Sequence, residues 1–351
     1  MRNFSYPLLI IVLIVLIGAN IFLSYNLFFS SLKSVSSKNE TEAQKEISQK
    51  RENPLPENKK VKIILVGDIM LDRGVEYMIK TEGKRDYKFP FLKIAPYLQK
   101  ADIVFGNLEG PITSDGQKIG SKYSFQDNPK CIEGLKYANF NVLSLANNHI
   151  LDYGQQGLID TINILKNNEI LYIGAGLNLK DAFSLKVKEI NGVKIGFLAF
   201  TEFGSQYWWP KENSPGVAYL PEKNFRYAKE EIEKAKKSVD ILMVSLHAGE
   251  EYKKEPTDFQ RKFAKMAIEA GADIVVGHHS HVIQPIEQYK NGWIAYSLGN
   301  FIFDQYFSND TMKGEILEVD IKNKKIEKVE GKEFRLNKFY QPYFEGLTLI
   351  K

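Results

Sequence analysis

Apolar residues in this chain form short continuous runs that change abruptly into polar segments. Stretches with helical spacing of apolar residues separate several of these runs, at 157–169, 225–238 and 258–271. Runs of four to six apolar residues without alternation are typical of strands that are buried on both faces. The pattern therefore predicts an α/β architecture. The six runs lie in segments 62–68, 102–110, 141–149, 240–250, 273–281 and 293–300.

The N-terminal region contains a longer apolar segment. Residues 7–29 include 23 positions without a charged side chain, and a helix of that length spans about 35 Å, enough to cross a bilayer core of roughly 30 Å. A cleaved signal peptide is the alternative, but it would have a shorter apolar segment and a cleavage site of small residues. We therefore predict a membrane anchor. The lysines that follow the segment favour a cytoplasmic body by the positive-inside rule, which is weak when a long domain follows.

Residues 31–60 are rich in Ser, Lys, Glu, Gln and Asn, a composition typical of a solvated stalk. The predicted organisation is an anchor at 1–30, a polar stalk at 31–60 and one folded domain at 61–351. Near the C-terminus, residues 316–336 alternate apolar and polar positions around a KNKK turn. This alternation predicts a hairpin that covers a sheet edge.

Composition narrows the class of protein. The net charge is only +4, with 47 basic and 43 acidic residues, so the chain lacks the strong basic balance of a nucleic-acid-binding protein. Cys131 is the single cysteine, which excludes an intrachain disulfide and a cysteine-based zinc site. With 44% apolar residues, the chain can bury a sizeable core.

Polar side chains gather where the predicted strands end. Functional groups of open α/β sheets lie beyond the carboxyl ends of the strands, so we expect these side chains to converge on one rim. All five histidines of the chain belong to this group. Its members are Asp68, Asn107, Glu109, Asn148, His149, Asp152, His247, His278, His279 and His281.

Imidazole, carboxylate and amide groups without a thiolate form a ligand set for Mn, Zn or Fe. The candidates outnumber the ligands of one tetrahedral site, which favours two divalent metal ions that clamp a phosphoester. In an extended strand His279 and His281 share one face, so both can reach the metals. His278 would face the other way, so we rank it below them and expect a supporting or packing role.

A further histidine is a candidate proton donor. His149 could protonate a leaving oxygen, and Asp152, three positions later, could orient its ring. Asp152 could equally cap the helix that we expect to begin near Gln155.

Three more polar residues near the strand ends are candidates for substrate binding. Arg73 could bind an anionic group through its guanidinium fork, or could pair with Asp72 or Glu76. Glu250 could contact the substrate or contribute only surface charge. Asn300 could line the site or stabilise a turn.

Six segments in order, over nearly all of 61–306, resemble the CapA family of poly-γ-glutamate capsule synthesis proteins. This family is similar to the calcineurin-like metallophosphoesterases, so the resemblance implies a four-layer α-β-β-α sandwich. It also implies a single-pass membrane protein with an extracytoplasmic body, because family members typically carry an N-terminal anchor. The segments are VGDIMLDRGV, FGNLEGPIT, SLANNHILDYG, SLHAGEEY, VVGHHSHVIQPIE and AYSLGNFIFDQ.

The resemblance also implies roles for individual residues. It makes His149 the general acid. The chain departs from the metallophosphoesterase pattern at Met70, where a histidine is usual, and at Asn107, where a bridging aspartate is usual; Glu109 is a possible substitute. The implied metal ligands are Asp68, Asn148, His247, His279 and His281.

Two functions follow. The first is a membrane-anchored component of poly-γ-glutamate synthesis or export that acts on or guides the acidic polymer, with other membrane subunits of capsule synthesis as partners. The second is a metal-dependent phosphoester hydrolase at the cell surface. Met70 and Asn107 favour the first function, whereas the retained ligands and His149 favour the second, so catalytic activity is left open.

Overall fold

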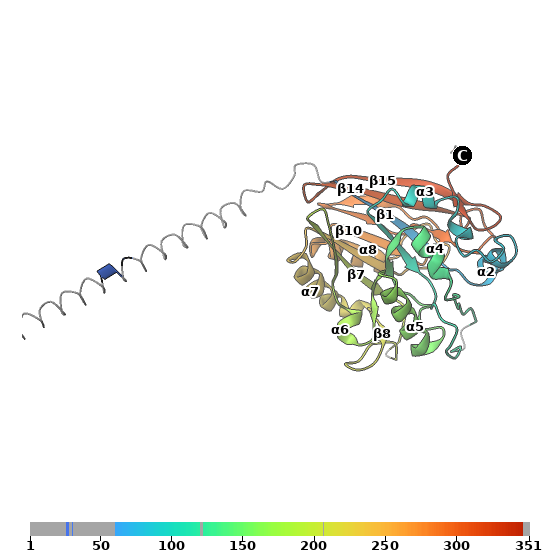
Figure 1. The fold of residues 1–351 in the computed structure, drawn as a ribbon, viewed down its shortest axis with the longest axis horizontal. Coiled ribbons are helices and arrows are strands. Elements are labelled where there is room, and N and C mark those ends of the chain that lie inside the picture. The colour runs from blue at the N-terminus through green and yellow to red at the C-terminus, as the bar shows by residue number, and fades with distance from the viewer. Residues whose placement is uncertain (1–25, 28–29, 31–59, 120–121, 206, 347–351) are drawn as a thin grey trace, which may run out of the picture. The chain divides into compact units, whose positions relative to one another are not determined.

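Two β-sheets with helices on their outer faces form the computed structural model, which describes residues 26, 27, 30, 60–119, 122–205 and 207–346 (Figure 1). The prediction of an α/β fold is confirmed. The predicted anchor at 7–29 and stalk at 31–60 lie almost entirely outside the described residues. None of the described helices combines the length and the apolar character of a membrane span. Residues 58–351 form one folded unit.

The first sheet is built around β1 and has the order β16-β15-β14-β1-β2-β3-β4, with β13 also pairing with β1. The strands β1 to β4 run parallel to one another, whereas β14, β15 and β16 are antiparallel to their neighbours. The predicted C-terminal hairpin is present as β14 and β15, and β14 pairs with β1, so the hairpin covers the edge of the parallel strands. The strands are β1 (Lys60–Ile69), β2 (Ile103–Leu108), β3 (Phe140–Ser144), β4 (Leu171–Ile173), β13 (Asn300–Ile302), β14 (Lys313–Lys322), β15 (Lys325–Leu336) and β16 (Pro342–Tyr343).

The second sheet has the order β11-β12-β10-β9-β7-β6, and only its two edge strands are antiparallel to their neighbours. The central strand β7 was not among the predicted runs. The strands are β6 (Lys186–Ile190), β7 (Val193–Thr201), β9 (Ile241–His247), β10 (Ile274–His278), β11 (Ile286–Tyr289) and β12 (Gly292–Ala295). A separate pair consists of β5 (Ala175–Gly176) and β8 (Gly216–Val217).

The three predicted helices are present as α5 (Gly154–Asn167), α7 (Phe225–Lys236) and α8 (Asp258–Glu269). The last of these starts with a capping box between Thr257 and Gln260, which satisfies two backbone N–H groups at the helix start. The remaining helices are short: α2 (Arg73–Lys80), η1 (Phe89–Phe91), α3 (Ala95–Leu98), α4 (Cys131–Tyr137), α6 (Leu179–Ala182) and η2 (Glu222–Asn224).

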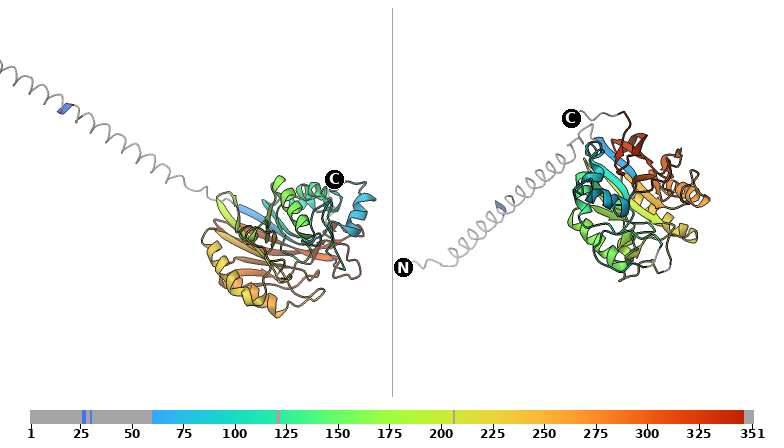
Figure 2. Two further views of the ribbon diagram at one scale, coloured as in Figure 1. Left: turned by 90° about the horizontal axis from the view of Figure 1, so that it is seen from below. Right: turned by 90° about the vertical axis from the view of Figure 1, so that its right-hand side faces the viewer.

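Alternate residues of β9 show how the layers pack. Ile241 and Met243 belong to the core that also contains the side chains of the first sheet, whereas Leu242 and Val244 pack with buried residues of α7 and α8. Since successive side chains of a strand point to opposite faces, the second sheet lies between the first sheet and these helices. Figure 2 shows α4 and α5 on the opposite side of the molecule, so the layers follow the order α-β-β-α.

A close approach of two backbone segments positions the end of β1. The backbone N–H of Asp68 donates to the carbonyl of Gly299 at 3.0 Å. A Cβ atom at Gly67 would lie only 1.8 Å from that carbonyl oxygen, so only glycine fits at this position. The contact fixes Asp68 beside Asn300, its partner in the pairing of β1 with β13.

Candidate metal centre

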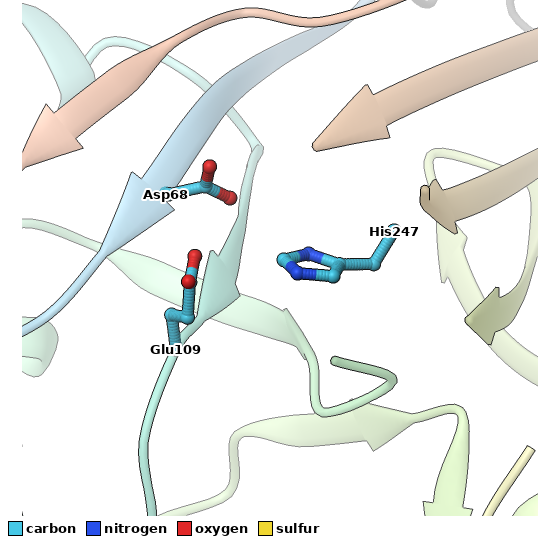
Figure 3. A group of neighbouring side chains, drawn as sticks. All are labelled: Asp68, Glu109 and His247. Atoms are coloured by element: carbon cyan, nitrogen blue, oxygen red, sulfur yellow. The ribbon is translucent and has the colours of Figure 1, made fainter. Parts of the chain in front are cut away.

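Asp68, Glu109 and His247 each offer a ligand atom, and these atoms lie within 4.8 Å of one another (Figure 3). Asp68 is near the end of β1, Glu109 follows β2, and His247 is the last residue of β9. All three side chains are fully buried. The carboxyl ends of parallel strands from both sheets therefore meet at one rim, as the position of the polar clusters predicts.

Asp68 is an ionised carboxylate surrounded by donors. Asn107 Nδ2 donates to its Oδ1 at 2.9 Å, and the backbone N–H of His279 donates to its Oδ2 at 3.1 Å. The nearest imidazole nitrogens are Nδ1 of His278 at 3.4 Å and Nδ1 of His281 at 3.5 Å. Burial alone would raise the pKa of Asp68, but the interactions with the two histidines hold it well below its usual range.

Glu109 carries a buried oxygen that lacks a hydrogen-bond partner among the described residues, Oε1. Its nearest imidazole nitrogens are Nε2 of His281 at 3.7 Å and Nε2 of His149 at 4.0 Å. Burial, followed by the charge of Asp68, raises the pKa of Glu109 well above its usual value. Leaving a buried acceptor unpaired costs about 1–3 kcal/mol. A divalent cation between Glu109 and Asp68 would remove this cost, so the residues fit a metal ion.

The histidines beside these carboxylates are suited to be neutral ligands. Burial, followed by the charge of His279, lowers the pKa of His247 well below its usual value, and burial lowers the pKa of His279 to about 3. The Nε2 atom of His247 is 2.7 Å from Asn148 Oδ1. The Nδ1 atom of His279 has no hydrogen-bond partner within the described part of the chain. Neutral imidazole is the form that binds a metal.

The backbone conformation of the segment with His278, His279 and His281 differs from the expected one. The strand β10 ends at His278, and His279 and His281 have φ values of +95° and +57°. The expectation of an extended segment with alternating faces is therefore wrong, although both rings are close to the site. The centroid of the His279 ring is 4.9 Å from that of His247. His278 does not face away, because its Nδ1 lies 3.4 Å from Asp68.

Asn107 connects the three candidate ligands through hydrogen bonds. Besides its bond to Asp68, its Nδ2 lies 3.4 Å from Glu109 Oε2 and 3.3 Å from His247 Nδ1. Asn147 donates to Asn107 Oδ1 at 3.1 Å. Glu109 belongs to the group that could hold a metal ion, and its role as a substitute for the aspartate that is usual at Asn107 stays a prediction. Met70 is buried in the hydrophobic core.

Asn147 is a supporting residue that the sequence interpretation missed. Its Oδ1 accepts hydrogen bonds from the backbone N–H groups of His149 and Ile150, at 3.1 and 2.9 Å. Its only signal in the sequence is its place as the first asparagine of NNH. Phe203 was also missed, and its ring centroid lies 4.0 Å from that of His279.

Asp152 contacts His149 and does not cap the following helix. His149 Nδ1 lies 2.7 Å from Asp152 Oδ2, which also accepts the backbone N–H of Phe125 at 2.9 Å. The N-cap residue of α5 is Tyr153, which makes no capping hydrogen bond through its side chain. The carboxylate therefore fixes the imidazole, whose other nitrogen faces Glu109.

The three residues predicted to bind substrate lie in different environments. Arg73 pairs with Asp304, rather than with Asp72 or Glu76, and its guanidinium lies 4.7 Å from the ring centroid of Phe125. Glu250 is exposed. For Arg73 and Glu250, contact with substrate stays a prediction.

Asn300 is buried, and its amide is fully engaged. Its Oδ1 lies 2.9 Å from His281 Nδ1, and its Nδ2 donates to Gln305 Oε1 and to the carbonyl of Thr311, each at 3.0 Å. These contacts orient His281. A contact of Asn300 with substrate also stays a prediction.

Comparisons with known proteins agree with the resemblance of the six sequence segments to the CapA family. The capsule biosynthesis protein CapA of Bacillus anthracis is 38% identical over 254 residues, which make up 71% of this chain and 61% of that protein. The PGA biosynthesis protein CapA of Bacillus subtilis is 40% identical over 243 residues, 68% of this chain and 62% of that protein. The chain thus covers less than two thirds of the length of either relative.

A solved structure of a phosphatase from Mycoplasma pneumoniae superposes with a TM-score of 0.45 at 18% identity, covering 78% of this chain and 93% of that one. The model of a family described as bacterial capsule synthesis protein PGA_cap matches residues 62–305, which include every candidate ligand. The chain therefore belongs to the PGA_cap family of bacterial capsule synthesis proteins.

Proposed function

We propose that this protein acts in the synthesis or export of poly-γ-glutamate at the cell surface, and that its rim site is a divalent metal centre that cleaves an anionic ester. Membership of the PGA_cap family supports the first part. The apolar segment 7–29 supports a membrane anchor with the body outside the cytoplasmic membrane. The acidic polymer and other membrane subunits of capsule synthesis are the proposed partners.

The observation that supports the metal centre is Glu109 Oε1, a buried oxygen without a partner among the described residues. Evolved cores leave few buried polar atoms without a partner, and this one faces a second carboxylate and an imidazole. Mn, Zn or Fe suits such a mixed ligand set. The α-β-β-α order of the layers supports the calcineurin-like fold, in which we propose one or two ions held by Asp68, Glu109, His247, His279 and His281, with Asn148 and Asn107 beside them.

The proposed chemistry divides between the cation and the residues of the chain. When bound, a divalent cation would neutralise and polarise the anionic group of the substrate. His149 would donate a proton to the leaving oxygen, and its hydrogen bond with Asp152 supports this role because it orients the ring. Glu109 lies on the other side of His149, so proton transfer and cation binding take place beside each other.

The test uses the full chain purified in detergent and dialysed against Mn, Zn or Fe before elemental analysis. Hydrolysis of bis-p-nitrophenyl phosphate is then measured for the wild type and for His149→Ala. We expect one to two bound metals per chain, and turnover that falls about 100-fold or more in the variant. Absence of bound metal would overturn the metal centre. Bound metal without turnover would refute catalysis and leave a protein that guides the polymer.

A further inference from the structure

Two aromatic side chains lie next to His281, a candidate ligand of the metal centre. The ring of Tyr252 is 6.1 Å from that of His281, centroid to centroid, and Phe307 packs against Tyr252 at 5.2 Å in an edge-to-face geometry. The two residues are nevertheless 43% and 65% exposed. We call this pair the aromatic platform.

The platform is held in place by the same residues that support the site. Tyr252 has a φ of +64°, and its backbone N–H donates to the carbonyl of Ser280 at 2.7 Å. Gln305 Nε2 donates to the Tyr252 hydroxyl at 3.3 Å, while Gln305 Oε1 accepts from Asn300, the partner of His281. The platform and the candidate ligand are therefore connected by a continuous set of hydrogen bonds.

The backbone conformation of Tyr252 is strained, and its ring is exposed. A bulky residue at positive φ costs on the order of 1–3 kcal/mol, and such strain clusters at functional sites. Exposed aromatic rings leave apolar area in water that a ligand would bury. Here the strain and the exposure coincide at one residue, Tyr252, which adjoins a candidate ligand.

The charge next to the platform is negative. Burial, then the charge of Glu251, raises the pKa of Tyr252. Glu251 directly precedes Tyr252 in the chain and is exposed, so it adds a negative charge beside the platform. A second anionic group of a ligand would be repelled at this position, whereas an uncharged ring would not.

We propose that Tyr252 and Phe307 bind an uncharged ring that is attached to the anionic group held at the metal centre. This inference rests on the proposed function, because the cation is required to bind the anion. The ligand is then an anionic ester that carries a ring with an apolar face, and free polyglutamate does not fit this description. A nucleobase and a sugar are two sources of such a ring, because both have a face that stacks on aromatic side chains.

The experiment measures binding by calorimetry to the full chain in detergent, with saturating Mn. The probes are phenylphosphonate, which has a ring, and methylphosphonate, which has none. We expect the wild type to bind phenylphosphonate about tenfold more tightly, and we expect Tyr252→Ala/Phe307→Ala to lose this advantage while its affinity for methylphosphonate is unchanged. Tyr252→Phe should keep the advantage, because it keeps the ring.

Tyr306→Ala is the matched control, because Tyr306 is 74% exposed in the same loop and no ring contact joins it to Tyr252 among the described residues. It should keep the preference for phenylphosphonate. Equal affinity of the wild type for the two probes, or an advantage that survives in the double variant, would overturn the proposal. Failure of methylphosphonate to bind would instead refute the metal centre, and the platform's role with it.

A second arm compares adenosine 5′-monophosphate with glucose 6-phosphate. Tighter binding of the nucleotide that is lost in the double variant assigns the platform to a nucleobase, and the reverse order assigns it to a sugar. If the double variant binds both compounds as the wild type does, the platform does not contact a ring.

Discussion

Two buried polar clusters share the strand β1, and their hydrogen bonding differs. Near the start of the strand, Glu318 accepts from Tyr97 on one oxygen, and its other oxygen lies 3.0 Å from Lys62 Nζ and 3.2 Å from Lys332 Nζ. Near the end of the strand, Glu109 Oε1 beside Asp68 has no partner within the described residues. Burial is similar, since the side chain of Glu318 is 9% exposed and that of Glu109 is fully buried.

This difference in hydrogen bonding distinguishes a structural cluster around Glu318 from a binding site around Glu109. Protein groups satisfy every oxygen of Glu318, and a saturated cluster of this kind stabilises the fold without a ligand. The cluster around Glu109 contains two carboxyl groups and several imidazoles, and among the described residues no Lys or Arg side chain pairs with its carboxyl groups. Changing one residue in each cluster should therefore affect different properties of the protein.

Glu109→Gln should have the largest effect, on metal binding. Removing one anionic ligand from a buried site should weaken the affinity for Mn or Zn by at least about 100-fold. Titration of the metal by calorimetry measures the change, and Glu318→Gln, in the saturated cluster, is the matched control with unchanged affinity. Equal affinity of Glu109→Gln and wild type would remove Glu109 from the metal centre.

Glu318→Gln should show the next largest effect, on stability. It replaces a carboxylate that accepts charged hydrogen bonds from two lysines, so the free energy of unfolding should fall by about 1–2 kcal/mol. The loss should be smaller than for a fully buried ion pair, because the two lysines are partly exposed to solvent. Urea unfolding of the metal-free protein measures this change. Glu109→Gln should leave metal-free stability unchanged or raise it, because it removes a buried carboxyl group whose Oε1 has no partner among the described residues and whose charged form is disfavoured by burial. A larger loss in Glu109→Gln than in Glu318→Gln would contradict the comparison.

The hydrogen bonding of Asp127 is intermediate between that of Glu318 and that of Glu109, because only one of its two carboxylate oxygens has a partner among the described residues. Its Oδ1 accepts the backbone N–H of Leu71 at 2.9 Å, but its Oδ2 has no partner among the described residues. Burial, followed by the charge of Asp72, raises the pKa of Asp127 well above the ordinary value of 3.8. The folded state therefore binds this proton more tightly than the unfolded chain.

The raised pKa of Asp127 sets the sign of a pH effect. Its contribution to stability is lost as pH rises from 3.8 through the folded-state pKa, by up to about 1.4 kcal/mol per pH unit. Asp127→Asn should remove this dependence and keep the bond to Leu71. Urea unfolding between about pH 4 and 7 tests it, with the exposed Asp115→Asn as control. The same slope in both variants would show that Asp127 is ionised without a penalty.

The smallest expected effect is that of Tyr306→Ala, at an exposed position outside both clusters. Its free energy of unfolding and its metal affinity should each differ from those of the wild type by less than about 0.5 kcal/mol. Thermal unfolding with and without Mn measures both. A larger loss of metal affinity would extend the site beyond the two carboxylates and the histidines.

Local patterns predicted most of the fold that positions the site. The strands β1, β2, β3, β9 and β10 correspond to continuous apolar runs, and such runs are visible without tertiary information. The run in β7 was missed because its six buried core residues are interrupted by Lys194 and Gly196 and follow a half-exposed edge strand. The convergence of all five histidines at strand ends followed from the rule for parallel sheets.

Long-range contacts explain what could not be predicted. The positive φ of His279 accompanies a hydrogen bond from its backbone to Asp68, and Arg73 pairs with Asp304 rather than with a neighbour in sequence. No local pattern reports partners more than 200 residues apart. The unpaired oxygen of Glu109 is likewise visible only when every possible donor around it has been placed.

The position of Asp68 and His247 on different sheets has a mechanical consequence. A cation held by both would act as a removable cross-link between β1 and β9, closing a long loop of chain much as a disulfide does. The chain has only one cysteine and therefore no internal disulfide. Occupancy of the site would then govern how tightly the two halves of the sandwich resist being pulled apart, and chelation would loosen them.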